Sequence, residues 1–148
     1  PQILIGLSAE ALGIMATLNT LTVDYSKTRQ QFGSPIGSFQ VLQHRMVDTF
    51  MGCEQTKSML YRGLCESKSV EEGETDAQAL SKTVHALKAT VARYGKTIGE
   101  EAIQLHGGIG MTDELNIGHY VKRLMMINTT FGDGDFHQKK FNQLSYSV

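Results

Sequence analysis

The chain has 148 residues, a formal net charge of -1, and 41% hydrophobic against 20% charged residues, which is typical of one globular domain with a single core. This near-neutral charge gives no reason to expect a nucleic acid partner, whose backbone favours a strongly basic surface. No apolar run approaches the roughly 18 to 20 residues that cross a bilayer, and the first residues lack the basic start of a signal peptide. We therefore expect neither a nucleic acid partner nor a membrane span.

Prolines and cysteines narrow the fold class further. Proline occurs only at Pro1 and Pro35, and such scarcity favours long helices over a many-stranded fold. Cys53 and Cys65 fall on one predicted helix, about 18 Å apart along its axis, which is too far for a disulfide. Free thiols indicate a reducing compartment, so we expect a cytoplasmic protein. The chain starts without an initiator Met, which is typical of a processed or excised fragment.

A first helix is predicted from about Gln2 to Thr28. Apolar residues recur there at alternating steps of three and four, which places one apolar stripe along a helix. The stripe consists of Leu4, Leu7, Ala11, Ile14, Leu18, Leu21 and Tyr25. Gly33 and Pro35 then act as stop signals, since the residue before a proline disfavours helix.

Two more long helices follow. The second is predicted from about Ser38 to Ser67, and the polar stretch 68–74 predicts a loop. The third begins at Thr75, where Thr75 and Gln78 fit a capping box, and stops at Gly107 and Gly108. The expected buried face of the second helix is Phe39, Leu42, Met46, Phe50, Cys53, Leu60 and Leu64, and that of the third is Leu80, Val84, Leu87, Val91, Tyr94, Ile98, Ala102 and Leu105.

Shorter helices complete the prediction. A fourth helix is expected from about Asp113 to Asn128, then a turn over residues 129–135, and a last short helix over His137 to Leu144. Three long helices and a shorter fourth, joined by short loops and without a predicted strand, predict an all-α antiparallel four-helix bundle with a short C-terminal helix.

Two segments are unusual for a plain bundle. Residues 29–40 read RQQFGSPIGSFQ, and residues 102–114 read AIQLHGGIGMTDE. Each puts glycines with an Arg or Gln where a long helix ends, and glycine allows a backbone to approach an anion such as a pyrophosphate. Each alone has a plainer interpretation, since a Gly-Gly pair commonly caps a helix and Arg29 suits a C-terminal helix dipole. Neither Lys-Ser nor Lys-Thr follows the glycines, which excludes a P-loop.

Taken together, the two segments closely resemble the acyl-CoA dehydrogenase family. The order also matches: a long helix, R-x-x-F-G-x-P-I-x-x-F-Q, two further long helices, then Q-L-H-G-G-x-G-M-T-D-E and K-R. The resemblance covers nearly the whole chain and corresponds to the family's C-terminal third, so residues 1–148 are expected to form one such domain. The family's helical N-terminal domain and middle β domain have no counterpart in these residues.

The resemblance implies FAD as the cofactor, a homo- or hetero-oligomer built as a dimer of dimers, and an acyl-CoA substrate bound through the parent protein. In that family the two segments reach the adenosine-pyrophosphate half of an FAD held mainly by a neighbouring subunit. Arg29 would pair with the pyrophosphate, because a guanidinium fork suits phosphate oxygens. The other implied cofactor contacts are Gln31, Phe32, Phe39, Gln40, Gln104, Gly107 and Gly108.

The reaction implied is α,β-dehydrogenation of an acyl-CoA thioester, in which a carboxylate removes the α-proton and the flavin takes the β-hydride. The family's Glu position falls at Phe131 or Gly132 here, and a position used by other members falls near Ile3, so no catalytic base is predicted. Asp133 or Asp135 is a poor substitute, because Asp is shorter by a methylene. The chain thus resembles a subunit type with a degenerate base position, as found in some heteromeric members.

Three other features have plainer interpretations. The segment Asp133–His137 lacks the rest of a calcium loop, so no metal site is predicted. His106 lies within the second motif, where it either touches the cofactor pocket or is a structural histidine. Glu10 in the first helix could pair with Arg93 or Arg123, or project into solvent.

Three functions stay open at this point. The parent protein is expected to be an FAD-dependent acyl-CoA dehydrogenase, of which the isolated chain would be inactive. The chain could instead be a non-catalytic partner subunit that completes a heteromeric enzyme, as the missing Glu suggests, or a helical interaction module without a cofactor. The electron acceptor, either an electron-transfer flavoprotein or oxygen, and the acyl chain length depend on domains outside this chain.

Overall fold

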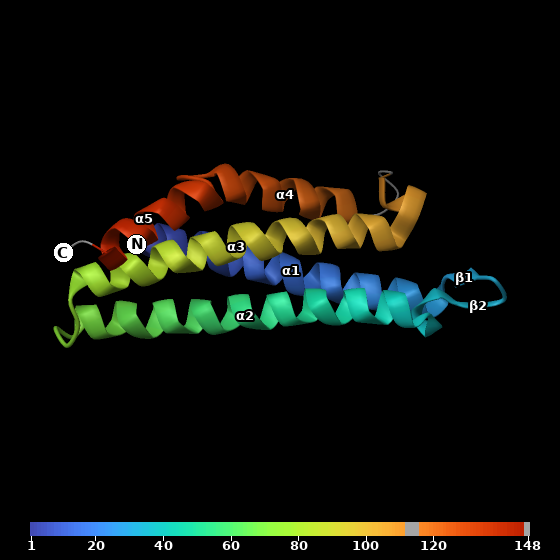
Figure 1. Ribbon diagram of the computed structural model, residues 1–148, viewed down its shortest axis with the longest axis horizontal. Helices are drawn as coiled ribbons and strands as arrows, with labels where there is room; N and C mark the ends of the chain where they lie inside the picture. Colours follow the sequence, from blue (N-terminus) through green and yellow to red (C-terminus); the bar gives the residue numbers. More distant parts are fainter. Residues whose placement is uncertain (112–115, 147–148) are drawn as a thin grey trace.

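The computed structural model describes residues 1–111 and 116–146 of the chain. Five α-helices make up most of these residues, and Figure 1 shows them as one elongated bundle. Their bounds are α1 (Gln2–Thr28), α2 (Gln40–Glu71), α3 (Ala77–His106), α4 (Ile117–Thr129) and α5 (Gly134–Tyr146). The predicted all-α bundle with a short C-terminal helix is confirmed.

Helix α3 is the central element, because it packs against α1, α2, α4 and α5. α1 and α3 run in the same direction, and α2 returns antiparallel to both (Figure 1). The C-terminal ends of α1 and α3 therefore lie at one end of the bundle, and the α2–α3 connection lies at the other. The largest fully buried apolar side chains are Met15, Leu18, Leu87, Ile98, Ile117 and Ile127.

The helix ends agree with the sequence in part. α1 has its predicted bounds, and α2 continues to Glu71, beyond the predicted end at Ser67. The predicted cap of α3 is wrong: Asp76, not Thr75, is the N-cap, and its carboxylate accepts the Gln78 amide at 3.1 Å. Both residue types suit an N-cap, so the sequence pattern alone could not decide between neighbours.

The last two helices differ more from the prediction. The expected start of the fourth helix, at residues 113–115, lies outside the described residues, and α4 is seen from Ile117. α5 starts at Gly134 instead of His137, because Asp133 caps it by accepting the Phe136 amide at 2.8 Å. The predicted turn over residues 129–135 is correspondingly shorter.

A short β-hairpin joins α1 to α2, so the expectation of no strand is wrong here. Strand β1 (Gln30–Gln31) pairs antiparallel with β2 (Ser34–Pro35), and the 3-10 turn η1 (Ile36–Ser38) leads into α2. The turn residues Phe32 and Gly33 both have positive φ, 54° and 80°, as a type I′ hairpin turn requires. Strands of two residues carry no usable periodicity, which is why the hydrophobic pattern did not signal them.

Some side chains assigned to buried stripes are exposed. Leu21 on α1, and Phe50 and Leu64 on α2, all face outward. α2 instead packs through a face that includes the small residues Gly52 and Gly63, which let neighbouring helices approach closely. Periodicity finds an apolar face, but it does not show which part of a wide face a neighbouring helix covers.

Helix α1 also bears on the membrane expectation. Within the described residues, α1 is long and apolar enough, by length and composition only, to cross a membrane, with a mean hydropathy of 1.4 over its most apolar window. A single helix of this kind is weak evidence for a membrane span. In the fold this helix packs against α2, α3 and α4, and core helices of globular bundles pass the same test.

The two cysteines are free thiols, as predicted. Cys53 is buried in the core and Cys65 is exposed. Burial raises the pKa of the Cys53 thiol, so this side chain acts as a small apolar residue rather than as a nucleophile.

Candidate functional site

The two glycine-bearing motifs meet at one end of the bundle. Because α1 and α3 run in the same direction, the hairpin after α1 lies beside η2 (Gly107–Met111), the 3-10 turn after α3. A pocket of about 410 Å³ lies between these segments. The residues that line it are Tyr25, Arg29, Gln31, Ile36, Gln104, Leu105, His106, Gly107, Gly108 and Ile109.

Backbone geometry ends both helices at this pocket. Arg29 leaves α1 in an extended conformation, while its N–H still donates to the Tyr25 carbonyl at 2.9 Å. Gly107 ends α3 with a φ of 62°, and its N–H donates back to the carbonyls of Gln104 and Ile103. This positive φ favours glycine, so the sequence at residue 107 fixes the point where the chain turns into η2.

An aromatic stack forms one wall of the pocket. The rings of Tyr25 and His106 lie 4.4 Å apart at an angle of 28°. His106 is buried, and its Nδ1 lies 2.8 Å from the Ala102 carbonyl. Since a carbonyl only accepts, Nδ1 carries the proton, and in the neutral ring Nε2 is left as an acceptor. Tyr25 was assigned to the apolar stripe of α1; its position one turn before Arg29 is the signal that would have placed it here.

The eight residues predicted to contact a cofactor do not all lie in the pocket. Its lining includes five of them, namely Arg29, Gln31, Gln104, Gly107 and Gly108. Phe32 projects from the hairpin turn with 94% of its side chain exposed, and its ring lies edge-on to Phe39 at 6.2 Å. Gln40 is exposed at the first position of α2. These last three residues form an adjacent surface on the hairpin and the start of α2.

The turn between α4 and α5 carries the candidate base position. Phe131 has a φ of 58° and Gly132 a φ of 107°, and the Phe131 side chain is 62% exposed. A Cβ added to Gly132 would lie 2.5 Å from Cδ1 of Phe136, so the Phe136 ring would have to shift, and a φ of 107° is strained for any residue but glycine. Of the two alignments left open by the sequence, position 131 therefore presents a side chain with less rearrangement than position 132.

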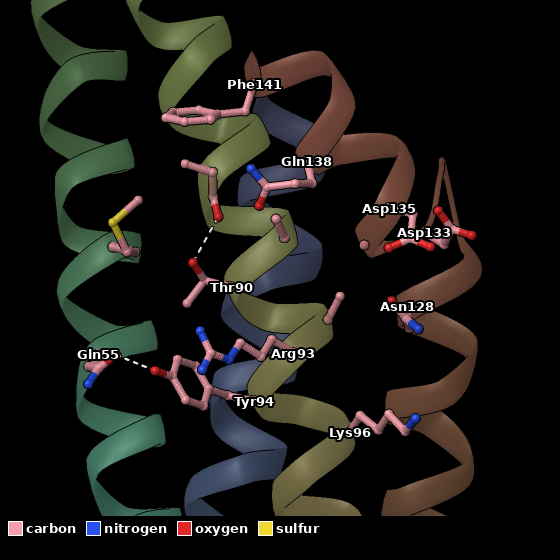
Figure 2. Close-up of a pocket in the computed structure, with 15 residues that line it drawn as sticks. Gln55, Thr90, Arg93, Tyr94, Lys96, Asn128, Asp133, Asp135, Gln138 and Phe141 are labelled. Atoms are coloured by element: carbon pink, nitrogen blue, oxygen red, sulfur yellow. Dashed lines mark hydrogen bonds between the residues drawn. The ribbon is translucent and has the colours of Figure 1, made fainter. Parts of the chain in front are cut away.

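Asp133 and Asp135 lie apart from the motif pocket. Both line an open groove of about 730 Å³ over α2, α3 and α5, with Arg93 and Tyr94 across from them (Figure 2). Asp133 is occupied as the cap of α5, and Asp135 lies in the first turn of that helix, where a carboxylate suits the dipole. Both aspartates thus have a structural role at the start of α5.

A polar cluster under the same turn was not predicted. Lys88 is completely buried on α3, and His137 on α5 contacts His85 on α3. Lys88 lies one residue after Leu87 on the apolar stripe, and a charged residue on the buried side of a helix is the signal that could have found it. Among the described residues no group of three or more side chains is arranged to hold a metal ion.

The alternatives for Glu10 are decided by geometry. Arg123 donates to both Glu10 oxygens, at 2.6 and 2.8 Å, and this hydrogen bonding lowers the pKa of the Glu10 carboxyl. Arg93 instead lies over the Tyr94 ring, and the Tyr94 hydroxyl is hydrogen-bonded to Gln55. The Glu10 pair joins α1 to α4 at the surface, where such a pair adds little stability.

The sequence is similar to those of known dehydrogenases. The chain is 37% identical over 122 residues to the acyl-CoA dehydrogenase IpdE2 of Mycolicibacterium smegmatis, covering 79% of this chain and 34% of that protein. It is 32% identical over 133 residues to the L-prolyl-[peptidyl-carrier protein] dehydrogenase of a Serratia strain, covering 90% of this chain and 33% of that protein. The chain thus spans about a third of the length of these curated relatives.

Solved structures and family models agree with these relatives. A structure described as PigA with FAD and proline superposes with a TM-score of 0.85 at 28% identity, covering 99% of this chain and 37% of that one. The family model for the acyl-CoA dehydrogenase C-terminal domain matches residues 5–140. The chain therefore belongs to the acyl-CoA dehydrogenase family, as its C-terminal helical domain.

Proposed function

We propose that this chain contributes the adenosine-pyrophosphate end of an FAD site, shared with a neighbouring subunit, in a flavin-dependent acyl-CoA dehydrogenase. The observation that carries the proposal is the motif pocket, because it brings Arg29 and Gln31 from one end of the sequence beside Gln104, Gly107 and Gly108. FAD occurs in the structure of the relative described as PigA with FAD and proline. The donor set fits this group: one cation for phosphate oxygens, and side-chain amides for polar atoms.

Each part of the pocket has a distinct task in this proposal. Arg29 pairs with phosphate oxygens, and Gln31 and Gln104 donate from their side-chain amides. The Tyr25 and His106 rings supply an apolar wall that keeps water from one side of the charged pair, and Gly107 lets the backbone approach closely. When bound, the flavin supplies the hydride acceptor for α,β-dehydrogenation of an acyl-CoA.

The test is FAD binding by the full-length protein with Arg29 changed to Ala. A charge-assisted contact to phosphate is worth about 1.5–3 kcal/mol, so the dissociation constant for FAD should rise by about 10- to 100-fold. Arg62→Ala is the matched control, since Arg62 is an exposed arginine of α2 that pairs with Glu66 far from the pocket. Equal FAD affinity of the two variants would sink the proposal, as would purification without flavin even after FAD is supplied.

A second candidate is a non-catalytic partner subunit in a heteromeric enzyme. The observation in its favour is that Phe131 stands where the family's carboxylate is expected, while Asp133 is engaged in capping α5. In this arrangement the partner supplies the base, and this chain completes the cofactor site. The free cysteines support the expectation of a reducing compartment such as the cytoplasm.

Substitution of the aspartates separates the two candidates. If the partner supplies the base, Asp133→Asn and Asp135→Asn should each leave turnover of the assembled enzyme within about two-fold of the parent. Asn at position 133 also caps helices well, and the Asp135 carboxylate contributes only a surface interaction with the helix dipole. A loss of about 100-fold or more in either variant would identify a base in this chain. Full turnover by a homo-oligomer would also contradict the partner role.

A further inference from the structure

A buried lysine lies beneath the turn that joins α4 to α5. Lys88 is 0% exposed, and its ammonium donates to the carbonyls of Ile127 at 2.8 Å, Asn128 at 3.1 Å and Gly132 at 3.0 Å. An ammonium has three N–H donors, so each of them has an acceptor within the protein. Two acceptors belong to the last turn of α4, where carbonyls have no helical partner and the dipole favours a cation.

A pair of histidines supports the same turn from α5. Nε2 of His137 lies 3.2 Å from the Phe131 carbonyl, and Nδ1 lies 2.7 Å from Nδ1 of His85. Because a carbonyl only accepts, Nε2 of His137 donates to the Phe131 carbonyl. Nδ1 of His137 is then unprotonated and accepts a hydrogen bond from Nδ1–H of His85. This arrangement uses neutral His137, and burial, together with the nearby His85 and Lys88, lowers its pKa to about 4.

The turn that receives these hydrogen bonds is unfavourable by itself. Phe131 adopts a φ of 58°, which is rare for a bulky side chain, and Gly132 follows with a φ of 107°. A residue held in a left-handed conformation persists only where its surroundings enforce it. The two carbonyls involved are the ones bonded by His137 and Lys88, so the contacts act where the backbone needs support.

We propose that Lys88 and His137 are positioning residues, which clamp the α4–α5 turn from inside the bundle and so fix the direction of the side chain at position 131. The clamp consists of the four hydrogen bonds from Lys88 and His137 to the carbonyls of Ile127, Asn128, Phe131 and Gly132. Each bond ends on a backbone atom, so the clamp acts in the same way whatever residue occupies position 131. It therefore presents Phe131 here as it would present a carboxylate.

Only one part of this inference rests on the proposed function, namely that position 131 faces the substrate. The clamp itself concerns the backbone and can be tested without flavin or acyl-CoA. Lys88 is a positioning rather than a catalytic residue, because its ammonium is buried under the turn and satisfied by carbonyls. A failure of FAD binding would therefore leave the clamp standing, and a failure of the clamp would leave the motif pocket unaffected.

The experiment is hydrogen exchange of backbone amides in the purified full-length protein carrying Lys88→Met. Methionine keeps the unbranched side chain but removes the three donors. We expect the amides of residues 130–137 to exchange at least about ten-fold faster, while those in the middle of α1 and α2 stay close to the parent rates. Lys96→Met on the same helix is the matched control, because the Lys96 side chain is largely exposed.

A second readout follows the titration of His137 by NMR. The Lys88 charge is one of the causes that lower the pKa of His137, so this pKa should rise toward its ordinary value in Lys88→Met and stay unchanged in Lys96→Met. A lysine that only filled space would not move it. If Lys88→Met fails to fold, His137→Phe removes the donor to Phe131 with a ring of similar size, and chymotrypsin should then cleave faster after Phe131.

The outcomes against the clamp are equally definite. If Lys88→Met and Lys96→Met exchange alike over residues 130–137, Lys88 does not hold the turn. If Lys88→Met speeds exchange evenly through α1, α2 and α3, the lysine supports the whole core rather than the turn. An unchanged rate of chymotrypsin cleavage in His137→Phe would exclude His137 from the clamp.

Discussion

Phe131 and Gly132 show how backbone conformation decides what a single position can carry. The sequence left the candidate base position open between these two residues. Gly132 has a φ of 107°, and a Cβ there would displace the Phe136 ring, whereas the Phe131 side chain is exposed. The structure therefore favours position 131 over position 132. This choice depends on the backbone conformation, which the residue types alone do not give. Lys88 was missed for a related reason, since its acceptors come from residues 127–132, far along the chain.

His137 makes the free energy of unfolding depend on pH. Its folded pKa of about 4 lies below the ordinary value of 6.5, because burial disfavours the charged ring; nearby His85 and Lys88 lower it further, while the Phe131 carbonyl and Asp133 raise it. The neutral ring is favoured on folding, so the stability it contributes is complete above pH 6.5 and is lost as pH falls toward 4.

The loss over that window should reach at most about 3 kcal/mol for this group, from about 1.4 kcal/mol per pKa unit. Urea unfolding between pH 7.5 and 4 measures it, with His137→Gln as the comparison. The variant should be less stable at pH 7.5 and should show a flatter dependence below pH 6.5. Parallel curves for the two proteins would assign the acid sensitivity to other groups.

Among the elements, all five helices were predictable, but the two short strands and some helix ends were not. The three-four rhythm gave α1 its observed bounds over Gln2–Thr28, because a long apolar face dominates local preference. The hairpin of β1 and β2 was not predicted, since each strand has only two residues and the turn depends on positive φ at Phe32 and Gly33. The N-terminal cap of α5 was also not predicted, because Asp133 was considered only as a metal ligand or a catalytic carboxylate.

The hairpin turn offers a test that separates stability from binding. Phe32 is a bulky residue at a φ of 54°, and this conformation destabilises the fold. Because the ring is almost fully exposed, burial of its apolar surface does not offset that cost. Asn tolerates this conformation, and Phe32→Asn should raise the free energy of unfolding by about 0.5–1 kcal/mol. In the same variant FAD affinity of the full-length protein should fall several-fold if the ring contacts the cofactor.

Phe32→Leu serves as the control for that experiment. It keeps a branched apolar residue at the strained position but removes the ring, so stability should stay near that of the parent while FAD affinity still falls. Calorimetry and fluorescence titration with FAD measure the two quantities. Unchanged FAD affinity in both variants would leave Phe32 without a role in binding.

At the scale of the whole molecule, the motif pocket follows from the direction of the helices. Two segments about seventy residues apart meet because α1 and α3 run in the same direction and end together. The sequence predicted a four-helix bundle, and the family resemblance predicted that its motifs share a ligand, so five of the eight named residues line one pocket. Tyr25 and His106 could not be paired beforehand, because a stacked contact depends on how deeply α1 and α3 pack.

On α2, two apolar side chains that the sequence pattern predicted to be buried are exposed. Phe50 and Leu64 were expected in the core, yet Phe50 is 58% exposed. With the neighbouring apolar residues of the same face they form an outward stripe along α2, made up of Val47, Phe50, Met51, Tyr61 and Leu64. Glu54 and Lys57, which pair with each other, lie between the two ends of this stripe. Exposed apolar residues gathered on one helix are typical of an interface, and the family resemblance leads us to expect another dehydrogenase subunit against them.

Placing a charge on that stripe tests the expectation. Phe50→Glu should weaken association of the full-length protein by about 10-fold or more, because the centre of an interface tolerates an unpaired carboxylate poorly. Sedimentation velocity over a concentration series measures the change, and a thermal midpoint close to that of the parent would show that the bundle itself is intact. Asn142→Glu, which adds the same charge to an exposed position of α5, should leave the mass unchanged. If both variants sediment like the parent, the apolar residues of α2 face solvent in the assembly, and the subunits meet through other helices.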